Sequence, residues 1–223
     1  MPQKILFPLL LALSVCLDTL FIVADGFVSH KLSVISKTAA TFCILCIGLF
    51  CLAQSGPDAA SILVIAGLGC GMLGDLFLAL HGDAAFYTGV CFFFAGHVLY
   101  ILSFLLTSSF MIALPALGAA AVLCVLMFLL VLRKMIEQRS KRYAMAGYSL
   151  FLLWMFCCAL LSLIMTKQAR FWPACLGAAL FCVSDTVLGF MLFGGLDKKF
   201  APVLCMGTYY AAQTCLALSI LFT

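Results

Sequence analysis

The chain has 223 residues, of which 66% are hydrophobic and only 9% charged, and its formal net charge is +4. Soluble domains contain about a quarter charged residues, so this composition excludes a soluble globular protein and predicts an all-α, polytopic membrane helix bundle. The small positive excess lies mostly in loops, where it indicates membrane topology rather than nucleic-acid binding.

Apolar runs of about 20 residues, the length that crosses a hydrocarbon core, predict eight transmembrane helices in one domain over residues 1–223. The second run is the shortest, and without it seven helices remain. The first run follows Lys4 but lacks a clean small-x-small cleavage site, so we expect a retained helix rather than a cleaved signal peptide. The predicted helices lie near residues 4–25, 37–54, 59–80, 85–106, 110–132, 144–166, 171–194 and 200–222.

Lysine and arginine are concentrated in the loops at one end of this predicted bundle. The loops at 26–36, 81–84, 133–143 and 195–199 hold most of the 12 basic residues, with Lys37 at their edge. The positive-inside rule places these loops in the cytoplasm and both termini on the other side of the membrane.

Cysteine and histidine do not form a recognisable ligand cluster. The 13 cysteines lie mostly inside apolar runs, where cysteine packs as a small hydrophobe, so free thiols are expected. Cys43 and Cys46 form a CxxC pair, but no histidine or second CxxC accompanies them. The sequence therefore predicts neither a metal site nor a bound cofactor.

Glycines are unusually dense in the third predicted helix. Gly67, Gly69, Gly71 and Gly74 are not a phosphate-binding loop, because no strand precedes them and no Lys-Ser/Thr follows. The spacing of Gly67 and Gly71 is typical of small-xxx-small packing, which predicts a close neighbouring helix beside Asp75.

Two aspartates interrupt apolar runs, Asp75 in GLGCGMLGDLFLAL and Asp185 in LGAALFCVSDTVLGF. An uncompensated carboxylate in the hydrocarbon core costs at least about 2.5–3.5 kcal/mol on insertion scales, so such residues usually line a polar cavity. No lysine or arginine lies in the central part of any predicted span, so we expect neither aspartate to have a salt-bridge partner. They lie about 16 and 14 residues into helices of one orientation, which predicts a shared cavity in the cytoplasmic half.

Other polar side chains fall at a similar depth. His97 and Tyr100 share one face of the fourth predicted helix. In the eighth, Gln213 accompanies Tyr209 and Tyr210, which cannot share a face, so only one of these tyrosines needs to line the cavity. Each of these residues also has a purely structural interpretation, as a packing or interfacial side chain.

Two further residues have weaker predicted roles. Lys37, at the cytoplasmic start of the second predicted helix, could reach a phosphate by extending its side chain. Asp18, in the first predicted helix, is expected to form hydrogen bonds or line the cavity rather than act in catalysis.

The two aspartate segments resemble each other. GDLFL at 74–78 is similar to SDTVL at 184–188, and each precedes a helix that contains tyrosine with histidine or glutamine. Since the segments lie four helices apart, a parallel 4+4 duplication would account for the similarity.

Four blocks of sequence stand out in a fixed order along the chain: GDLFLAL at 74–80, FFFAGHVLYILSF at 92–104, GAALFCVSDTVLGF at 177–190 and TYYAAQTCLALS at 208–219. These blocks closely resemble the YhhN family of membrane proteins, whose characterised members are lysoplasmalogenases. Lys37-Thr38 takes the place of the family's lysine-proline, so the lysine is retained and the proline is not. Tyr148 resembles the family's tyrosine in helix six.

The resemblance implies a cofactor-independent hydrolase that cleaves the vinyl ether bond of a lysoplasmalogen, a lysophospholipid of the bilayer. The products are a fatty aldehyde and glycerophosphoethanolamine or glycerophosphocholine. Asp75 and Asp185 would be the catalytic pair, one donating a proton to the alkenyl carbon and the other, ionised, activating water; the sequence leaves the assignment open. The residues expected to bind substrate are Lys37, His97, Tyr100, Tyr148, Ser184, Tyr209 and Gln213.

Two other classes of protein pair membrane aspartates. A proton-coupled transporter of a lipid or small solute would use such acids as a relay. An intramembrane aspartyl protease would need a Pro-Ala-Leu tripeptide after both aspartates, whereas residues 115–117 lie between them and Leu73 breaks the required glycine pattern. The transporter is therefore the main alternative.

Overall fold

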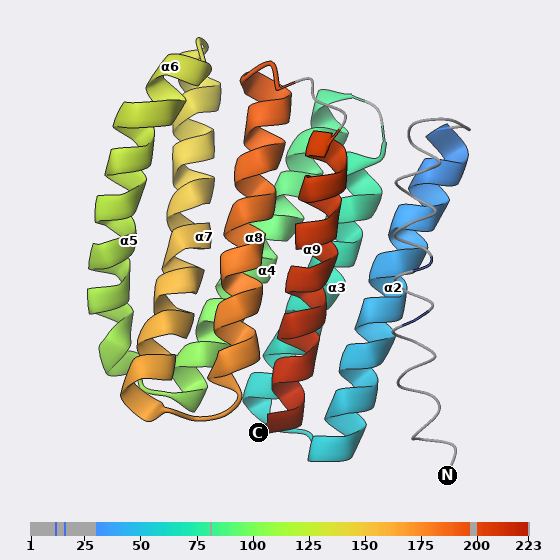
Figure 1. Cartoon of the computed structure of the whole chain (residues 1–223), viewed down its shortest axis with the longest axis vertical. Helices are drawn as coiled ribbons and strands as arrows, with labels where there is room; N and C mark the ends of the chain where they lie inside the picture. The colour runs from blue at the N-terminus through green and yellow to red at the C-terminus, as the bar shows by residue number, and fades with distance from the viewer. Residues whose placement is uncertain (1–11, 13–15, 17–29, 81, 197–199, 223) are drawn as a thin grey trace.

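The computed structural model describes residues 30–80, 82–196 and 200–222, together with residues 12 and 16 (Figure 1). All regular elements within these residues are helical, and seven segments are long and apolar enough to cross a membrane. The longer helices are α2 (His30–Ser55), α3 (Ala59–Leu78), α4 (Asp83–Thr107), α5 (Ala113–Met127), α7 (Arg139–Thr166), α8 (Phe171–Phe193) and α9 (Phe200–Leu218). Short turns complete two spans: η1 (Phe110–Ile112), the π-helical η2 (Phe128–Leu132), α6 (Arg133–Met135) and η3 (Ser219–Phe222).

Seven of the predicted spans are confirmed, including the short second one. The predicted helix at 4–25 lies almost entirely outside the described residues, and Asp18 with it, so the count of eight and the 4+4 duplication stay predictions. Two helices begin earlier than hydropathy indicates, α2 at His30 and α7 at Arg139. Their first turns are polar, and backbone hydrogen bonding continues there although the apolar run has ended; Arg142 N, for example, donates to Gln138 O.

Six of the described helices form a closed ring. Successive contacts join α2 to α3, α3 to α4, α4 to α7, α7 to α8, α8 to α9, and α9 back to α2. Helix α5 packs outside this ring against α7 (Figure 1). The interior of the ring is therefore the one place in the described chain that side chains from six helices can reach together.

Glycines let α3 lie very close to its neighbours, as the small-xxx-small spacing predicts. A Cβ atom built on Gly67 would collide with the ring of Tyr100 on α4. One built on Gly71 would collide with the amide of Gln213 on α9 and lie 3.4 Å from the hydroxyl of Tyr209. The absence of side chains at these positions makes room for polar groups from two neighbouring helices beside α3.

The C-terminal ends of α3, α6 and α8 and the N-terminal ends of α4, α7 and α9 lie at the same end of the bundle, the upper end in Figure 1. In the sequence, basic residues are concentrated in the loops that join these helix ends. Asp75 is close to this end, three residues before the last residue of α3. The site therefore lies toward the basic end, while the assignment of that end to the cytoplasm remains a prediction.

Candidate active site

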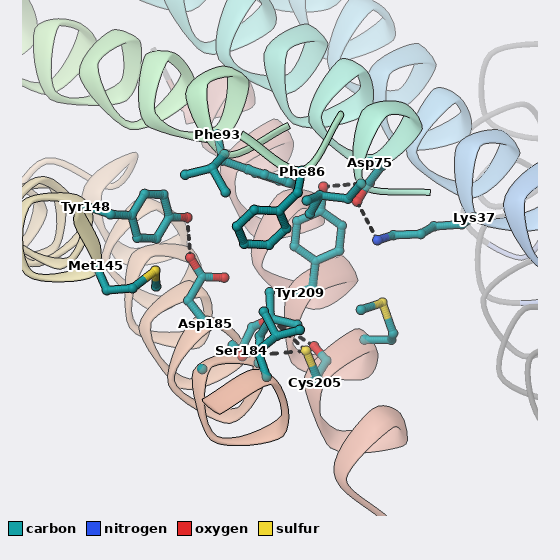
Figure 2. Close-up of a pocket in the computed structure, with 16 residues that line it drawn as sticks. Lys37, Asp75, Phe86, Phe93, Met145, Tyr148, Ser184, Asp185, Cys205 and Tyr209 are labelled. Carbon is teal, nitrogen blue, oxygen red and sulfur yellow. Dashed lines mark hydrogen bonds and ion pairs between the residues drawn. The ribbon is translucent and has the colours of Figure 1, made fainter. Parts of the chain in front are cut away.

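A cavity of about 220 Å³ lies inside the ring, and every ring helix contributes to its wall (Figure 2). Both aspartates line it, in agreement with the prediction of a shared cavity. Most of the remaining wall is apolar, including Phe93 and Met145. The polar lining residues are Lys37 from α2, Asp75 from α3, Tyr148 from α7, Ser184 and Asp185 from α8, and Cys205 and Tyr209 from α9.

Asp75 is buried with a countercharge. Its side chain is 1% exposed, its Oδ1 lies 2.9 Å from Lys37 Nζ, and its Oδ2 accepts a hydrogen bond of 2.8 Å from the Tyr209 hydroxyl. The prediction that neither aspartate has a salt-bridge partner is therefore wrong for Asp75. Helix α2 begins at His30 rather than near residue 37, which places Lys37 two turns inside the helix, from where its side chain reaches the ring interior.

Asp185 has a different environment. The Tyr148 hydroxyl donates a hydrogen bond to its Oδ2 (Figure 2). His97 Nε2 lies 3.0 Å from the same hydroxyl and 4.0 Å from Asp185 Oδ2. Within the described residues no lysine or arginine forms an ion pair with this carboxyl. The two aspartates thus differ in one property that bears on their charge, the presence of an ammonium group at ion-pair distance.

A chain of hydrogen bonds, each donating toward the next residue, ends at Asp75. The Tyr100 hydroxyl donates to Gln213 Oε1 at 3.0 Å, and Gln213 Nε2 donates to the Tyr209 hydroxyl at 3.1 Å. Tyr209 then directs its own proton at Asp75. This direction is compatible with a charged Asp75 but does not distinguish it from Asp185, which accepts a hydrogen bond from Tyr148 in the same way.

Three predicted substrate-binding residues do not line the cavity. His97, Tyr100 and Gln213 are buried behind its wall, where His97 contacts Tyr148, Gln213 contacts Tyr209, and Tyr100 donates to Gln213. Their geometry supports positioning of Tyr148 and Tyr209 rather than direct contact with substrate. Hydropathy gives the depth of a residue but not which side of its helix faces the cavity, so this distinction was not available from the sequence.

Ser184 lines the cavity, but its hydroxyl is engaged. It donates to the Cys205 carbonyl at 3.0 Å and so joins α8 to α9. Cys205, Met145 and Phe93 were not singled out from the sequence, since an apolar residue in an apolar run gives no signal of its own. Among the described residues no group of three histidine, cysteine or acidic side chains lies close enough to hold a metal ion.

The crossing helices and the two enclosed carboxyls define a polytopic membrane protein with an acidic cavity inside its bundle. The chain belongs to the YhhN family: the family model matches residues 32–220, which include every polar residue of the cavity. No curated protein and no solved structure was found to match the chain with significance.

The close approach at Gly71 gives a testable expectation. A methyl group in Gly71→Ala would displace Gln213, and with it Tyr209, from Asp75. Overpacking of this kind costs about 1–3 kcal/mol, so we expect a lower melting temperature in detergent. If the cavity is catalytic, the misplaced Tyr209 should also lower turnover by about tenfold or more. Gly69→Ala is the matched control because a Cβ there meets nothing within 4 Å; equal effects of the two variants would contradict this explanation.

Proposed function

We propose that the protein hydrolyses the vinyl ether bond of lysoplasmalogens, releasing a fatty aldehyde and a glycerophosphodiester. Membership of the YhhN family supports this proposal, since its characterised members are lysoplasmalogenases. The observation that supports it most is the pair of unlike carboxyls, one with a lysine and one without, on the wall of one cavity.

Asp185 is the proton donor in this proposal, and Asp75 is the ionised partner. The ammonium of Lys37 at 2.9 Å stabilises a negative charge on Asp75. A buried carboxyl without such a countercharge is favoured in its neutral form, which is the state a general acid requires. The sequence left this assignment open, and the position of Lys37 supports one of the two alternatives.

The reaction balances with these two groups alone. Asp185 gives its proton to the alkenyl carbon remote from oxygen, and the double-bond electrons form the new C–H bond and leave an oxocarbenium ion. Water attacks the carbon bonded to oxygen while Asp75 takes a proton from that water, which gives a hemiacetal. The hemiacetal hydroxyl then returns a proton to Asp185 as the aldehyde forms, and Asp75 protonates the departing glycerol oxygen.

The decisive experiment uses purified full-length protein in detergent with a 1-alkenyl lysophosphoethanolamine, and measures aldehyde release. Sustained turnover is expected, because the mechanism needs no ion gradient. A proton-coupled transporter, the alternative function, would leave the substrate intact in detergent and would move it only across a sealed membrane. Absence of aldehyde from protein that remains folded would overturn the proposal.

A further inference from the structure

A second cavity, of about 220 Å³, adjoins the first at the basic end of the bundle. The two share four lining residues, so a single elongated ligand can occupy both; these are Phe86, Val90, Met145 and Leu192. The second cavity differs from the first in its charges, because Asp83 on α4 and Lys141 on α7 line it. We call it the vestibule.

The vestibule and the active-site cavity lie along the same helix faces. On α4, Asp83, Phe86, Tyr87 and Val90 follow the i, i+3, i+4, i+7 spacing of one face, and all four line the vestibule. On α7 the same spacing joins Lys141 to Ala144 and Met145 in the vestibule, and then to Tyr148 in the active-site cavity. Lys141 is therefore two helical turns, about 10 Å, beyond the tyrosine that contacts Asp185.

The charged pair of the vestibule has no part in the proposed mechanism. Asp83 and Lys141 are exposed, and neither belongs to the Lys37–Asp75 ion pair or to the His97–Asp185 contact, so within the described residues neither has a charged partner. Beside Asp83, the rings of Phe86 and Tyr87 meet edge to face with centroids 5.5 Å apart. A carboxylate next to two aromatic rings is a favourable environment for an organic ammonium group, whereas a lysine attracts a phosphate.

A third cavity, of about 90 Å³, also adjoins the active-site cavity. It shares Met145, Tyr148, Asp185 and Gly189 with the first cavity and is otherwise mostly apolar. It lies between α7, α8 and the span that contains the π-helical turn η2. Asp185 thus lies on the wall of both the active-site cavity and this mostly apolar cavity, and the charged vestibule shares Met145 with both of them.

We infer that the vestibule binds the zwitterionic headgroup of the lysolipid, with Lys141 at the phosphate and Asp83, Phe86 and Tyr87 at the ammonium. This inference rests on the proposed function and adds a headgroup preference to it. From the ether oxygen of a lysophospholipid, the phosphorus is about five bonds or roughly 6 Å away, and the ammonium about nine bonds or roughly 11 Å. A lysolipid with its vinyl ether at Asp185 and its hydrocarbon in the third cavity therefore places both charges in the vestibule.

Binding of nonreactive ligands tests this inference without relying on catalysis. The probes are saturated 1-alkyl lysophosphocholine and 1-alkyl glycerol phosphate, titrated into full-length protein in nanodiscs. Lys141→Gln is expected to weaken both ligands by about three- to tenfold, since both contain the phosphate. Asp83→Asn is expected to weaken only the choline ligand, and to leave the phosphate ligand unchanged or tighter because a repulsive charge is removed.

Matched controls at the same end of the bundle are Lys134→Gln and Glu137→Gln, which remove exposed charges outside the vestibule. Tyr87→Leu should weaken the choline ligand selectively, and it tests the ammonium site even if Asp83→Asn loses its fold. Equal weakening of both ligands by Asp83→Asn, or effects no larger than in the controls, would overturn the inference. Headgroup-selective binding without any aldehyde release would support headgroup binding in the vestibule and reject the proposed reaction. Aldehyde release at a rate independent of the headgroup would support the reaction and reject headgroup binding in the vestibule.

Discussion

Replacing Asp185 by asparagine is expected to lower the rate of aldehyde release by at least about 10²-fold, because an amide has no acidic proton to give to the alkenyl carbon. Asparagine keeps the size of the side chain, and its oxygen can still accept the hydrogen bond from Tyr148. No described lysine or arginine loses a partner in this variant. The melting temperature should therefore stay close to that of the unmodified protein while activity is lost.

The same change at Asp75 is expected to abolish activity and also to reduce stability. Removing one member of a buried ion pair leaves the other uncompensated, at a cost of about 3–5 kcal/mol in well-buried cases. Lys37→Met combined with Asp75→Asn should recover much of the melting temperature but none of the turnover. Full activity in either single asparagine variant would remove that residue from the chemistry, and equal stability of the two would contradict the unequal environments of the carboxyls.

The second large effect is a difference in cleavage rate among lysolipids that differ in the bond at the sn-1 position. A saturated 1-alkyl lysolipid should not be cleaved at all, because it has no double bond that can accept the proton to form an oxocarbenium ion. A 1-acyl ester should be a poor substrate, since acyl transfer usually requires a nucleophile activated by a base. Ser184 and Thr186, the hydroxyls on either side of Asp185 in sequence, each donate a proton to a backbone carbonyl instead.

The measurement compares aldehyde, alcohol and fatty acid release from three lysolipids that differ only at the sn-1 bond. The saturated ether should still compete with the vinyl ether, because both place the same chain and headgroup in the protein. Efficient ester cleavage would mean that the cavity performs a different reaction, and failure of the ether to compete would mean that substrate binds elsewhere.

The spans of this protein could be predicted from the sequence because burial in lipid requires about 20 apolar residues in a row. The same criterion explains why the starts of α2 and α7 were predicted too late. Each of these helices extends through polar residues at the basic end, where hydropathy no longer marks a helix. Lys37 and Asp75 both lie toward this end, Asp75 three residues before the last residue of α3. A search for basic residues limited to the central part of each span therefore could not find the ion pair that distinguishes the two aspartates.

The sequence predicted how deep in the membrane each site residue lies, but not whether its side chain faces the cavity. A carboxyl in an apolar run is costly, so Asp75 and Asp185 were evident, and Tyr209 followed from its level in the bundle. That Tyr148 and Tyr209 line the cavity while His97 and Gln213 lie behind them depends on how each helix is rotated about its axis. This rotation is set by contacts between helices, such as the approach of Gln213 to Gly71, which involve residues far apart in the sequence.

The side chains that hydrogen-bond to the two carboxyls differ in whether they can exchange donor and acceptor roles. The amide of Gln213 has its donor and acceptor on different atoms, so the relay from Tyr100 to Asp75 keeps one polarity unless the side chain rotates in a tightly packed space. The imidazole of His97 can instead exchange donor and acceptor roles by changing tautomer. Tyr148 can then turn its proton toward His97 when Asp185 is protonated and toward Asp185 when it is not. In the proposed mechanism, the support of Asp185 would thus follow each proton that this carboxyl loses and regains, whereas Asp75 would keep a hydrogen-bond donor of fixed direction.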